Sequence, residues 1–128
     1  MAIGLADLAV GNLQMSTMKK FVNYEQKQFL IMTRTEKMFN EITTLIHERG
    51  SIYGHPYPQH ERIAKLWSAY LCYPVTPNQV AMCMALVKIS RSVESPEIDD
   101  HYKDAIAYLS ISKTVHEAMQ DSALDWQD

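Results

Sequence analysis

Two pairs of charged residues in the second half of the chain have the types and spacing needed to bind a phosphate and a metal ion. Lys88 and Arg91 lie three residues apart, and Asp100 and Asp104 lie four residues apart. Side chains at these spacings share one face of a helix. Lysine and arginine bind phosphate through charge-assisted hydrogen bonds, whereas Mg²⁺ takes one or two carboxylates together with phosphate oxygens. The pattern therefore predicts phosphate binding by the basic pair and Mg²⁺ binding by the acidic pair.

A purely structural role explains the same two pairs. The segment between them is short, which is typical of antiparallel helices that pack side by side, so we expect all four side chains to converge in one patch. Opposite charges in such a patch form ion pairs that hold a helix hairpin together, and the carboxyl end of a helix favours cations by itself. A ligand site and an ion-pair cluster are therefore alternatives at this stage.

An aromatic segment at residues 51–58 supplies a second group of candidates. It contains two prolines and a glycine, which predict an ordered loop rather than a helix or a strand. Arg49 and Tyr53 belong to this loop region, and Trp67 follows in the next predicted helix. Aromatic rings of this kind stack on nucleobases. Packing in the core is the alternative role for Tyr53 and Trp67.

Periodic apolar residues predict the helices that position these side chains. The first predicted helix begins near Thr33, which has the spacing of a capping box with Glu36, and it ends at Gly50. Residues 1–33 have weaker patterning that is interrupted by glycine, so we expect them to form a separate N-terminal arm or extension.

Three further helices are expected, at about residues 59–73, 77–91 and 97–119, each bounded by a proline. Thr76, Pro77 and Gln79 combine a capping box with a proline in the first turn at the start of the third helix. That helix has one charged residue, Lys88, between positions 80 and 89, so we expect it at the centre of the domain or of an oligomer. The fourth helix has apolar residues on two faces, which indicates packing on its own domain and on a second copy.

The patterns together predict an all-α protein. We expect a compact bundle of four to five helices over residues 34–120, a frayed tail at 121–128, and a homo-oligomer, as a dimer or larger. The net charge of −3 and pI of about 5.9 argue against a protein that binds nucleic acid by broad phosphate neutralisation. No apolar run approaches the roughly 20 residues that span a bilayer. Cys72 and Cys83 lie in apolar patterns and are expected to be reduced core thiols, which favours a cytoplasmic location.

Residues 49–108 resemble a known family. The motifs are an arginine followed by a Tyr-Gly-x-Pro loop (Arg49, Tyr53), a tryptophan helix (Trp67), a Lys-x₂-Arg pair, and an Asp-x₃-Asp pair followed by Tyr108. This order resembles the phage and prophage family catalogued as domain of unknown function 6378, whose members are small helical proteins of unknown activity. The resemblance implies a phage-encoded protein in the host cytoplasm and adds Tyr108 to the candidate ligand contacts.

The chain is more distantly similar to the all-α nucleoside triphosphate pyrophosphohydrolases of the MazG and dimeric dUTPase type. Those enzymes bind Mg²⁺ through E-x₂-E and E-x₂-D motifs, which this chain lacks. The first functional hypothesis is therefore a protein that binds a nucleotide or nucleoside phosphate. In its more specific version, the protein is a Mg²⁺-dependent hydrolase of that ligand. The second is a non-enzymatic phage effector that inhibits a host protein or sequesters a signalling nucleotide, using residues 1–33 and the tyrosine-rich loop.

Overall fold

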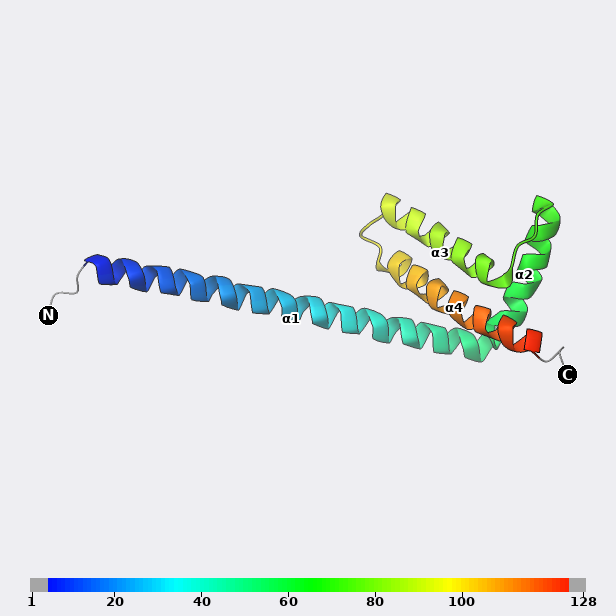
Figure 1. Cartoon of the computed structure of the whole chain (residues 1–128), viewed down its shortest axis with the longest axis horizontal. Coiled ribbons are helices and arrows are strands. Elements are labelled where there is room, and N and C mark those ends of the chain that lie inside the picture. The colour runs from blue at the N-terminus through cyan, green and yellow to red at the C-terminus, as the bar shows by residue number, and fades with distance from the viewer. Residues whose placement is uncertain (1–4, 125–128) are drawn as a thin grey trace. The chain divides into compact units, whose positions relative to one another are not determined.

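The protein is all-α, as predicted. The computed structural model describes the backbone of residues 5–124 and the side chains of residue 11 and residues 14–123. Within this range it contains four helices and no strand: α1 (Leu5–Tyr53), α2 (Pro56–Leu71), α3 (Pro77–Glu94) and α4 (Asp99–Leu124) (Figure 1). The chain divides into two compact units, Met1–Met38 and Phe39–Asp128. The second unit is a helical bundle that holds every candidate site residue.

The predicted ends of the first helix are both wrong. The helix passes through Thr33, whose hydroxyl donates to the carbonyl of Phe29 (2.9 Å) instead of capping a first turn. It also passes through Gly50 and ends at Tyr53. Gly54 provides the termination, because its φ of 76° is the left-handed conformation and its N–H donates to the carbonyl of Gly50 (2.9 Å).

The predicted aromatic loop is reduced to two residues, Gly54 and His55. α2 begins at Pro56 rather than near Gln59, because a proline fits the first turn of a helix, where its missing N–H has no intrahelical acceptor. His55 is the N-cap residue, and its Nδ1 accepts a hydrogen bond from the N–H of Tyr57 (3.1 Å). The tight connection brings the end of α1 directly to the start of α2.

The start of the third helix is confirmed. Thr76 is the N-cap residue of α3, and the side-chain oxygen of Gln79 accepts a hydrogen bond from its N–H (2.9 Å). α4 extends beyond the predicted end at residue 119 to Leu124, so the first part of the predicted frayed tail is helical. Residues 125–128 of that tail, and residues 1–4 of the predicted arm, lie outside the described residues.

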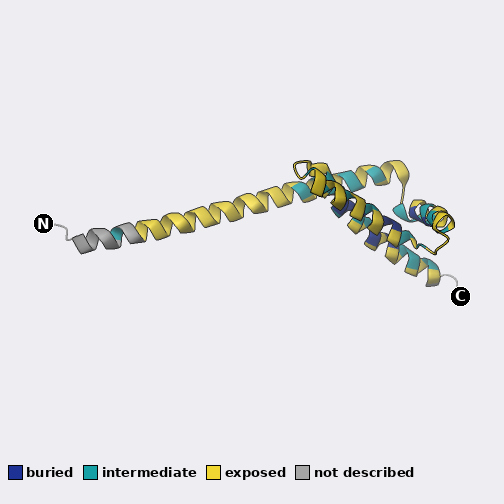
Figure 2. Cartoon of the chain, turned by 90° about the horizontal axis from the view of Figure 1, so that it is seen from above, coloured by how far each residue is buried: buried dark blue, intermediate teal, exposed yellow. Residues whose placement is uncertain are grey.

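Small residues allow α3 and α4 to pack closely. Ala81 and Ala85 on α3 and Ala105 on α4 are buried, and the hydroxyl of Ser112 on α4 donates to the carbonyl of Asn78 on α3 (3.0 Å). The buried positions gather where the helices of the second unit meet (Figure 2). Within the single chain α3 is buried on this face only, so it is not enclosed at the centre of the domain, and a central place in an oligomer stays a prediction.

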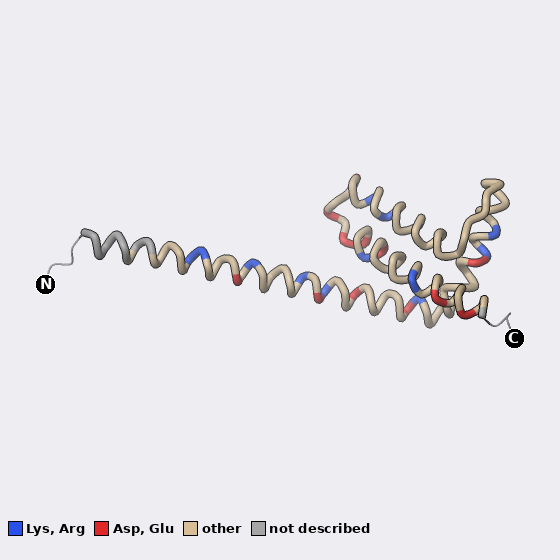
Figure 3. The backbone as a smooth tube through the Cα atoms, viewed as in Figure 1, with Lys and Arg blue, Asp and Glu red and all other residues tan. Residues whose placement is uncertain are grey.

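Both cysteines are exposed, in contrast to the expected core thiols. Cys72 follows the last residue of α2 in the left-handed conformation, with φ of 52°, and Cys83 lies on the uncovered side of α3. Acidic and basic residues are interspersed along the helices of the described range (Figure 3). No helix within residues 5–124 combines the length and the hydropathy that crossing a membrane requires.

Candidate functional site

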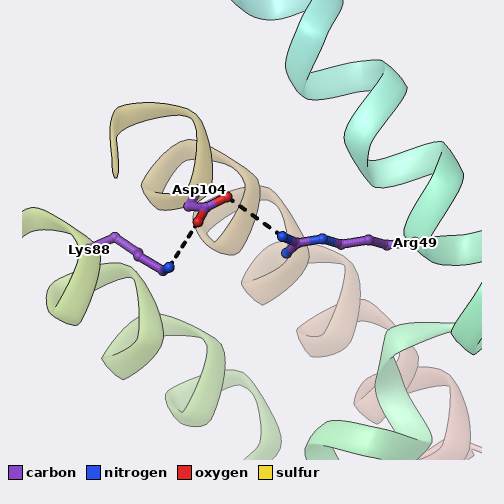
Figure 4. A network of polar contacts seen from close by, with 3 residues as sticks. All are labelled: Arg49, Lys88 and Asp104. Atoms are coloured by element: carbon purple, nitrogen blue, oxygen red, sulfur yellow. Dashed lines mark ion pairs between the residues drawn. The ribbon is translucent and has the colours of Figure 1, made fainter. Parts of the chain in front are cut away.

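Three helices contribute charged side chains to one cluster around Asp104. Nζ of Lys88, on α3, lies 2.8 Å from Oδ2 of Asp104, on α4. Nη2 of Arg49, on α1, lies 3.7 Å from Oδ1 of the same carboxylate (Figure 4). The side chains of Lys88 and Asp104 are each 16% exposed, whereas that of Arg49 is 42% exposed. The cluster therefore has a well-covered ion pair and a more accessible guanidinium beside it.

The close packing of α3 and α4 explains why Lys88 reaches Asp104. Ala81, Ala85 and Lys88 lie at i, i+4 and i+7 and share one face of α3. Asp104 directly precedes the buried Ala105. Because the alanines let the two backbones approach, the lysine stem lies along the interface and its ammonium group meets the carboxylate. The sequence prediction of a charged contact between these two helices is confirmed for this pair.

The other half of the predicted constellation does not join the cluster. Arg91, near the end of α3, and Asp100, near the start of α4, are both exposed, and within the described residues they form no ion pair with each other. Arg49 takes the place expected for Arg91. The expectation that both basic and both acidic side chains share one patch is therefore met only by Lys88 and Asp104.

A cavity of about 740 Å³ opens beside the cluster. Three residues predicted from the sequence line it, namely Arg49, Tyr53 and Tyr108, whereas Trp67 on α2 does not. Its walls come from the end of α1, the start of α2 and the middle of α4, with one residue of α3. The remaining lining residues are Leu45, Ile46, Gly50, Gly54, His55, Pro56, Gln59, His60, Ile63, Met84, Ala107 and Ile111. We call this space the Arg49 cavity.

His60 is a cavity residue that the sequence analysis missed. It is only 5% exposed, and its Nδ1 lies 2.8 Å from the carbonyl oxygen of Pro56. Because a carbonyl only accepts, Nδ1 carries the proton in this contact. The available signal was its spacing with Ile63, Ala64 and Trp67, at i, i+3, i+4 and i+7, which places His60 on the same helix face as apolar residues.

The start of α2 offers few backbone donors to an anion, although it lines the cavity. Pro56 and Pro58 have no N–H, and the N–H of Tyr57 is already bound by Nδ1 of His55. The N–H groups that usually bind phosphate at a helix start are thus removed or used here. An anion in this cavity would therefore have to be bound by side chains, chiefly by Arg49.

The predicted Mg²⁺ ligands, Asp100 and Asp104, do not fit a resident metal ion as they are arranged. Each oxygen of Asp104 faces a cationic side chain, and a metal would have to compete with both. Among the described residues, no three or more His, Cys, Asp or Glu side chains form a group able to hold a metal ion. A Mg²⁺ that arrives together with phosphate oxygens stays a prediction.

A further ion pair joins α1 to α4 beside the cluster, between Glu41 and Lys103. The hydrogen bond to Glu41 raises the pKa of Lys103 above its ordinary value of 10.5, and the negative charges of Glu41, Asp100 and Asp99 act in the same direction. Desolvation acts against this increase. The pair adds a second electrostatic link that holds the end of α1 against α4.

The chain is similar to two mycobacteriophage proteins, each called Gene 55 protein. It is 35% identical to that of Mycobacterium phage L5 over 82 residues, which cover 63% of this chain and 49% of the relative. It is 33% identical to that of Mycobacterium phage D29 over 84 residues, which cover 65% of this chain and 56% of the relative. The chain thus spans about half the length of these relatives. No solved structure matches it.

A known protein family matches the part of the chain that forms the cluster and the cavity. The match covers residues 37–116, which include the end of α1, all of α2 and α3, and most of α4. It confirms the family resemblance drawn from the Arg49, Trp67, Lys88 and Asp104 motifs, whereas the likeness to pyrophosphohydrolases gains no support from these matches. The chain belongs to the family described as domain of unknown function (DUF6378).

Proposed function

We propose that this protein binds a nucleoside phosphate in the Arg49 cavity, with a phosphate group at Arg49 and the base deeper inside. The observation that carries the proposal is the combination of a cavity of about 740 Å³ with a guanidinium in its wall. Cavities of roughly 300–1,000 Å³ accommodate small-molecule ligands and cofactors. The cavity is therefore large enough for a nucleotide.

Arg49 retains the capacity to bind phosphate. Its Nη2 is 3.7 Å from Asp104, which is too long for a hydrogen bond, and a guanidinium carries five N–H donors. Two parallel N–H donors match two phosphate oxygens, and such bidentate contacts are among the strongest hydrogen bonds in proteins. A phosphate at this position would replace a loose ion pair by a close one.

Apolar and aromatic side chains suit the rest of the cavity to a base. Tyr53 is 70% exposed at the end of α1, and Tyr108 is half-buried on α4. Ile63 and Ile111 add aliphatic surface to the lining. Stacking of a base on an aromatic ring contributes about 1–3 kcal/mol. The 70% exposure of Tyr53 leaves its ring available for such a contact.

The hydrolase form of the proposal depends on Mg²⁺ bound together with the ligand. Phosphate oxygens at Arg49 would compete with Asp104 for the nearby cations, and a carboxylate released in this way is a suitable Mg²⁺ ligand. If a nucleotide stabilises the protein only when Mg²⁺ is present, the result would support a Mg²⁺-dependent hydrolase. Stabilisation without Mg²⁺ would support binding alone.

Thermal unfolding with ligand tests the proposal. Nucleoside mono-, di- and triphosphates and inorganic triphosphate are added with and without Mg²⁺, and a ligand at 100 times its Kd adds about 2.7 kcal/mol of stability. We expect Arg49→Gln to abolish the shift. Arg62→Gln, at an exposed arginine on α2 outside the cavity, serves as the matched control and should retain it. Absence of any shift in the wild type would refute the proposal.

An effector that binds a host protein is the second candidate function. The observation in its favour is a set of exposed apolar side chains on the first unit: Met15, Met18, Phe21, Val22, Tyr24, Phe29, Leu30, Ile31 and Met32. Exposed apolar surface of this extent commonly marks an interaction site. Deletion of residues 1–31 should abolish capture of the host protein and leave the cooperative unfolding of the second unit intact. Capture that survives the deletion would exclude this role for the first unit.

A further inference from the structure

The two histidines that line the Arg49 cavity are fixed as opposite tautomers. Nδ1 of His55 accepts a hydrogen bond from the N–H of Tyr57, so a neutral His55 carries its proton on Nε2. Nδ1 of His60 donates to the carbonyl of Pro56, so a neutral His60 has a lone pair on Nε2. His55 thus offers a donor and His60 an acceptor to the groups around them.

Nε2 of His60 is accessible and meets no donor within the described residues. Every buried polar side-chain atom in the part of the chain that the structure describes has a hydrogen-bond partner. Nε2 of His60 has no partner among the described residues, so this atom must lie in the small part of the residue that stays accessible. The Arg49 cavity is the space that His60 lines. A neutral His60 can therefore offer Nε2 as an acceptor to a ligand in the cavity that it lines, with no competing protein donor among the described residues.

The different exposure of Arg49 and His60 favours one orientation of a bound nucleotide. Arg49 has 42% of its side chain exposed, whereas His60 is 5% exposed. The phosphate of a bound nucleotide, which needs the cation and tolerates water, therefore lies toward Arg49. In this orientation the base would be the part nearest His60.

We propose that His60 is a specificity-determining residue of this site, whose Nε2 accepts a hydrogen bond from an N–H on the edge of the base. The inference rests on the proposed binding of a nucleoside phosphate in the same cavity. It assigns the ligand to compounds that carry both an anionic group and a base N–H, and it separates them from simple polyphosphates. A buried acceptor left without a donor is costly, so a base that lacks this N–H is rejected.

Two substitutions separate the two nitrogens of His60. The amide of asparagine reaches the position of Nδ1, so His60→Asn keeps a donor for the carbonyl of Pro56 and removes the acceptor in the cavity. Glutamine reaches the position of Nε2, so His60→Gln keeps an acceptor there. The probes are dATP, dGTP, dCTP, dTTP and inorganic triphosphate, and their Kd values are measured by calorimetry.

We expect His60→Asn to weaken the tightest-binding nucleotide about tenfold, as for a lost hydrogen bond in a covered site, and to leave the Kd of triphosphate unchanged. His60→Gln should recover part of the loss. The unfolding midpoint of the unliganded His60→Asn protein should stay near that of the wild type. Equal Kd values for wild type and His60→Asn, or an equal loss for nucleotide and triphosphate, would overturn the inference.

A change in the ligand gives the same test without a change in the protein. Methylation of the base N–H in the tightest-binding nucleotide should weaken its binding to the wild type by a similar factor and cause no further loss in His60→Asn. If triphosphate binds the wild type as tightly as every nucleotide does, the role of His60 is refuted while the anion site at Arg49 stands. If no probe binds, the proposed function itself fails.

Discussion

Nζ of Lys88 and Oδ2 of Asp104 lie 2.8 Å apart, and each side chain is 16% exposed. At this distance the contact is a charge-assisted hydrogen bond between two consecutive helices. It joins α3 to α4 at a point where both backbones are already close. Because Arg49 approaches the same carboxylate from α1 at 3.7 Å, a single acidic residue connects three helices, and its partner Arg49 lines the cavity. The stability of the bundle and the proposed binding of an anion at Arg49 are thus linked through Asp104.

Replacement of Asp104 by asparagine should lower the stability of the protein and raise its affinity for anions. The amide removes the partner of a poorly exposed ammonium group, and we expect a loss of about 1.5–3 kcal/mol in urea unfolding. It also removes the negative charge that opposes a phosphate at Arg49, so triphosphate without Mg²⁺ should bind more tightly. Glu117→Gln, which breaks the exposed pair with Lys113 on α4, should change stability by less than about 0.5 kcal/mol.

The effect of Mg²⁺ on Asp104→Asn decides between two roles of this carboxylate. If Asp104 is a metal ligand in the complex, Mg²⁺ should strengthen nucleotide binding to the wild type and not to the variant. If the residue is only a counter-ion, Mg²⁺ should affect both proteins equally. Unchanged unfolding free energy, unchanged anion affinity and an equal Mg²⁺ effect in both proteins would together show that Asp104 has neither role.

Replacement of Lys103 by glutamine should remove a contribution to stability that the wild type itself loses at strongly alkaline pH. The raised pKa means that folded Lys103 holds its proton more tightly than the unfolded chain does. The contribution is therefore complete below pH 10.5, the ordinary pKa, and it is lost as the pH rises through the pKa of the folded state. The difference in unfolding free energy between wild type and variant should stay constant up to this pH and then shrink.

Lys65→Gln, which affects the exposed pair with Glu61 on α2, provides the control for Lys103. Its difference from the wild type, measured over the same pH range, is the baseline against which the decline for Lys103→Gln is read. A difference for Lys103→Gln that grows with pH would have the opposite sign and would contradict the raised pKa.

Local signals in the sequence predicted the start of α3 correctly and the ends of α1 wrongly. At α3, the preferences of Thr76, Pro77 and Gln79 all concern the unsatisfied N–H groups of one first turn. The three signals therefore agree on a single helix start. At Thr33 and Gly50 the cap signals compete with continuation of the helix, which gives each residue a backbone hydrogen bond. The outcome at Gly50 depends on Gly54, four residues later, which takes the left-handed conformation instead.

The candidate site was partly predictable for a similar reason. Helix spacing and a short connection indicate that the end of α3 meets the start of α4, which is enough to predict contact between Lys88 and Asp104. They do not determine that Arg49 arrives from α1, because that requires the packing of a residue distant in sequence. The burial of His60 is likewise a tertiary property, and its type alone gives no sign of a cavity.

The two glycines that border the Arg49 cavity should respond oppositely to alanine. Gly50 is helical, and a Cβ added there meets no atom within 4 Å, so Gly50→Ala should stabilise the protein by about 0.5–1 kcal/mol through helix propensity. Gly54 has φ of 76°, so Gly54→Ala should destabilise it by about 1–2 kcal/mol despite equally open space. Urea unfolding measures both. The reverse pattern would mean that the helix ends at Gly50.

An apolar stripe on α3 bears on the predicted oligomer. Met82, Leu86, Ile89 and Val93 lie at i, i+4, i+7 and i+11, and their exposed fractions are 45, 62, 44 and 79%. This spacing places them on one face of the helix, separate from the face of Ala81 and Ala85 that packs on α4. We predict that a second copy of the chain covers this stripe, because an uncovered apolar helix face of three turns is unusual in a protein that stays monomeric.

The double variant Leu86→Glu, Ile89→Glu should be monomeric, with a mass of 14.7 kDa by light scattering, and should keep its helical circular dichroism. The wild type should be a dimer or larger, and its unfolding midpoint should rise with protein concentration, because association stabilises only the folded chain. Leu66→Glu, at a residue of α2 that is 69% exposed and outside the stripe, is the control and should remain associated. A wild type that stays monomeric at all concentrations would contradict the prediction, and the stripe on α3 would then need no second copy to cover it.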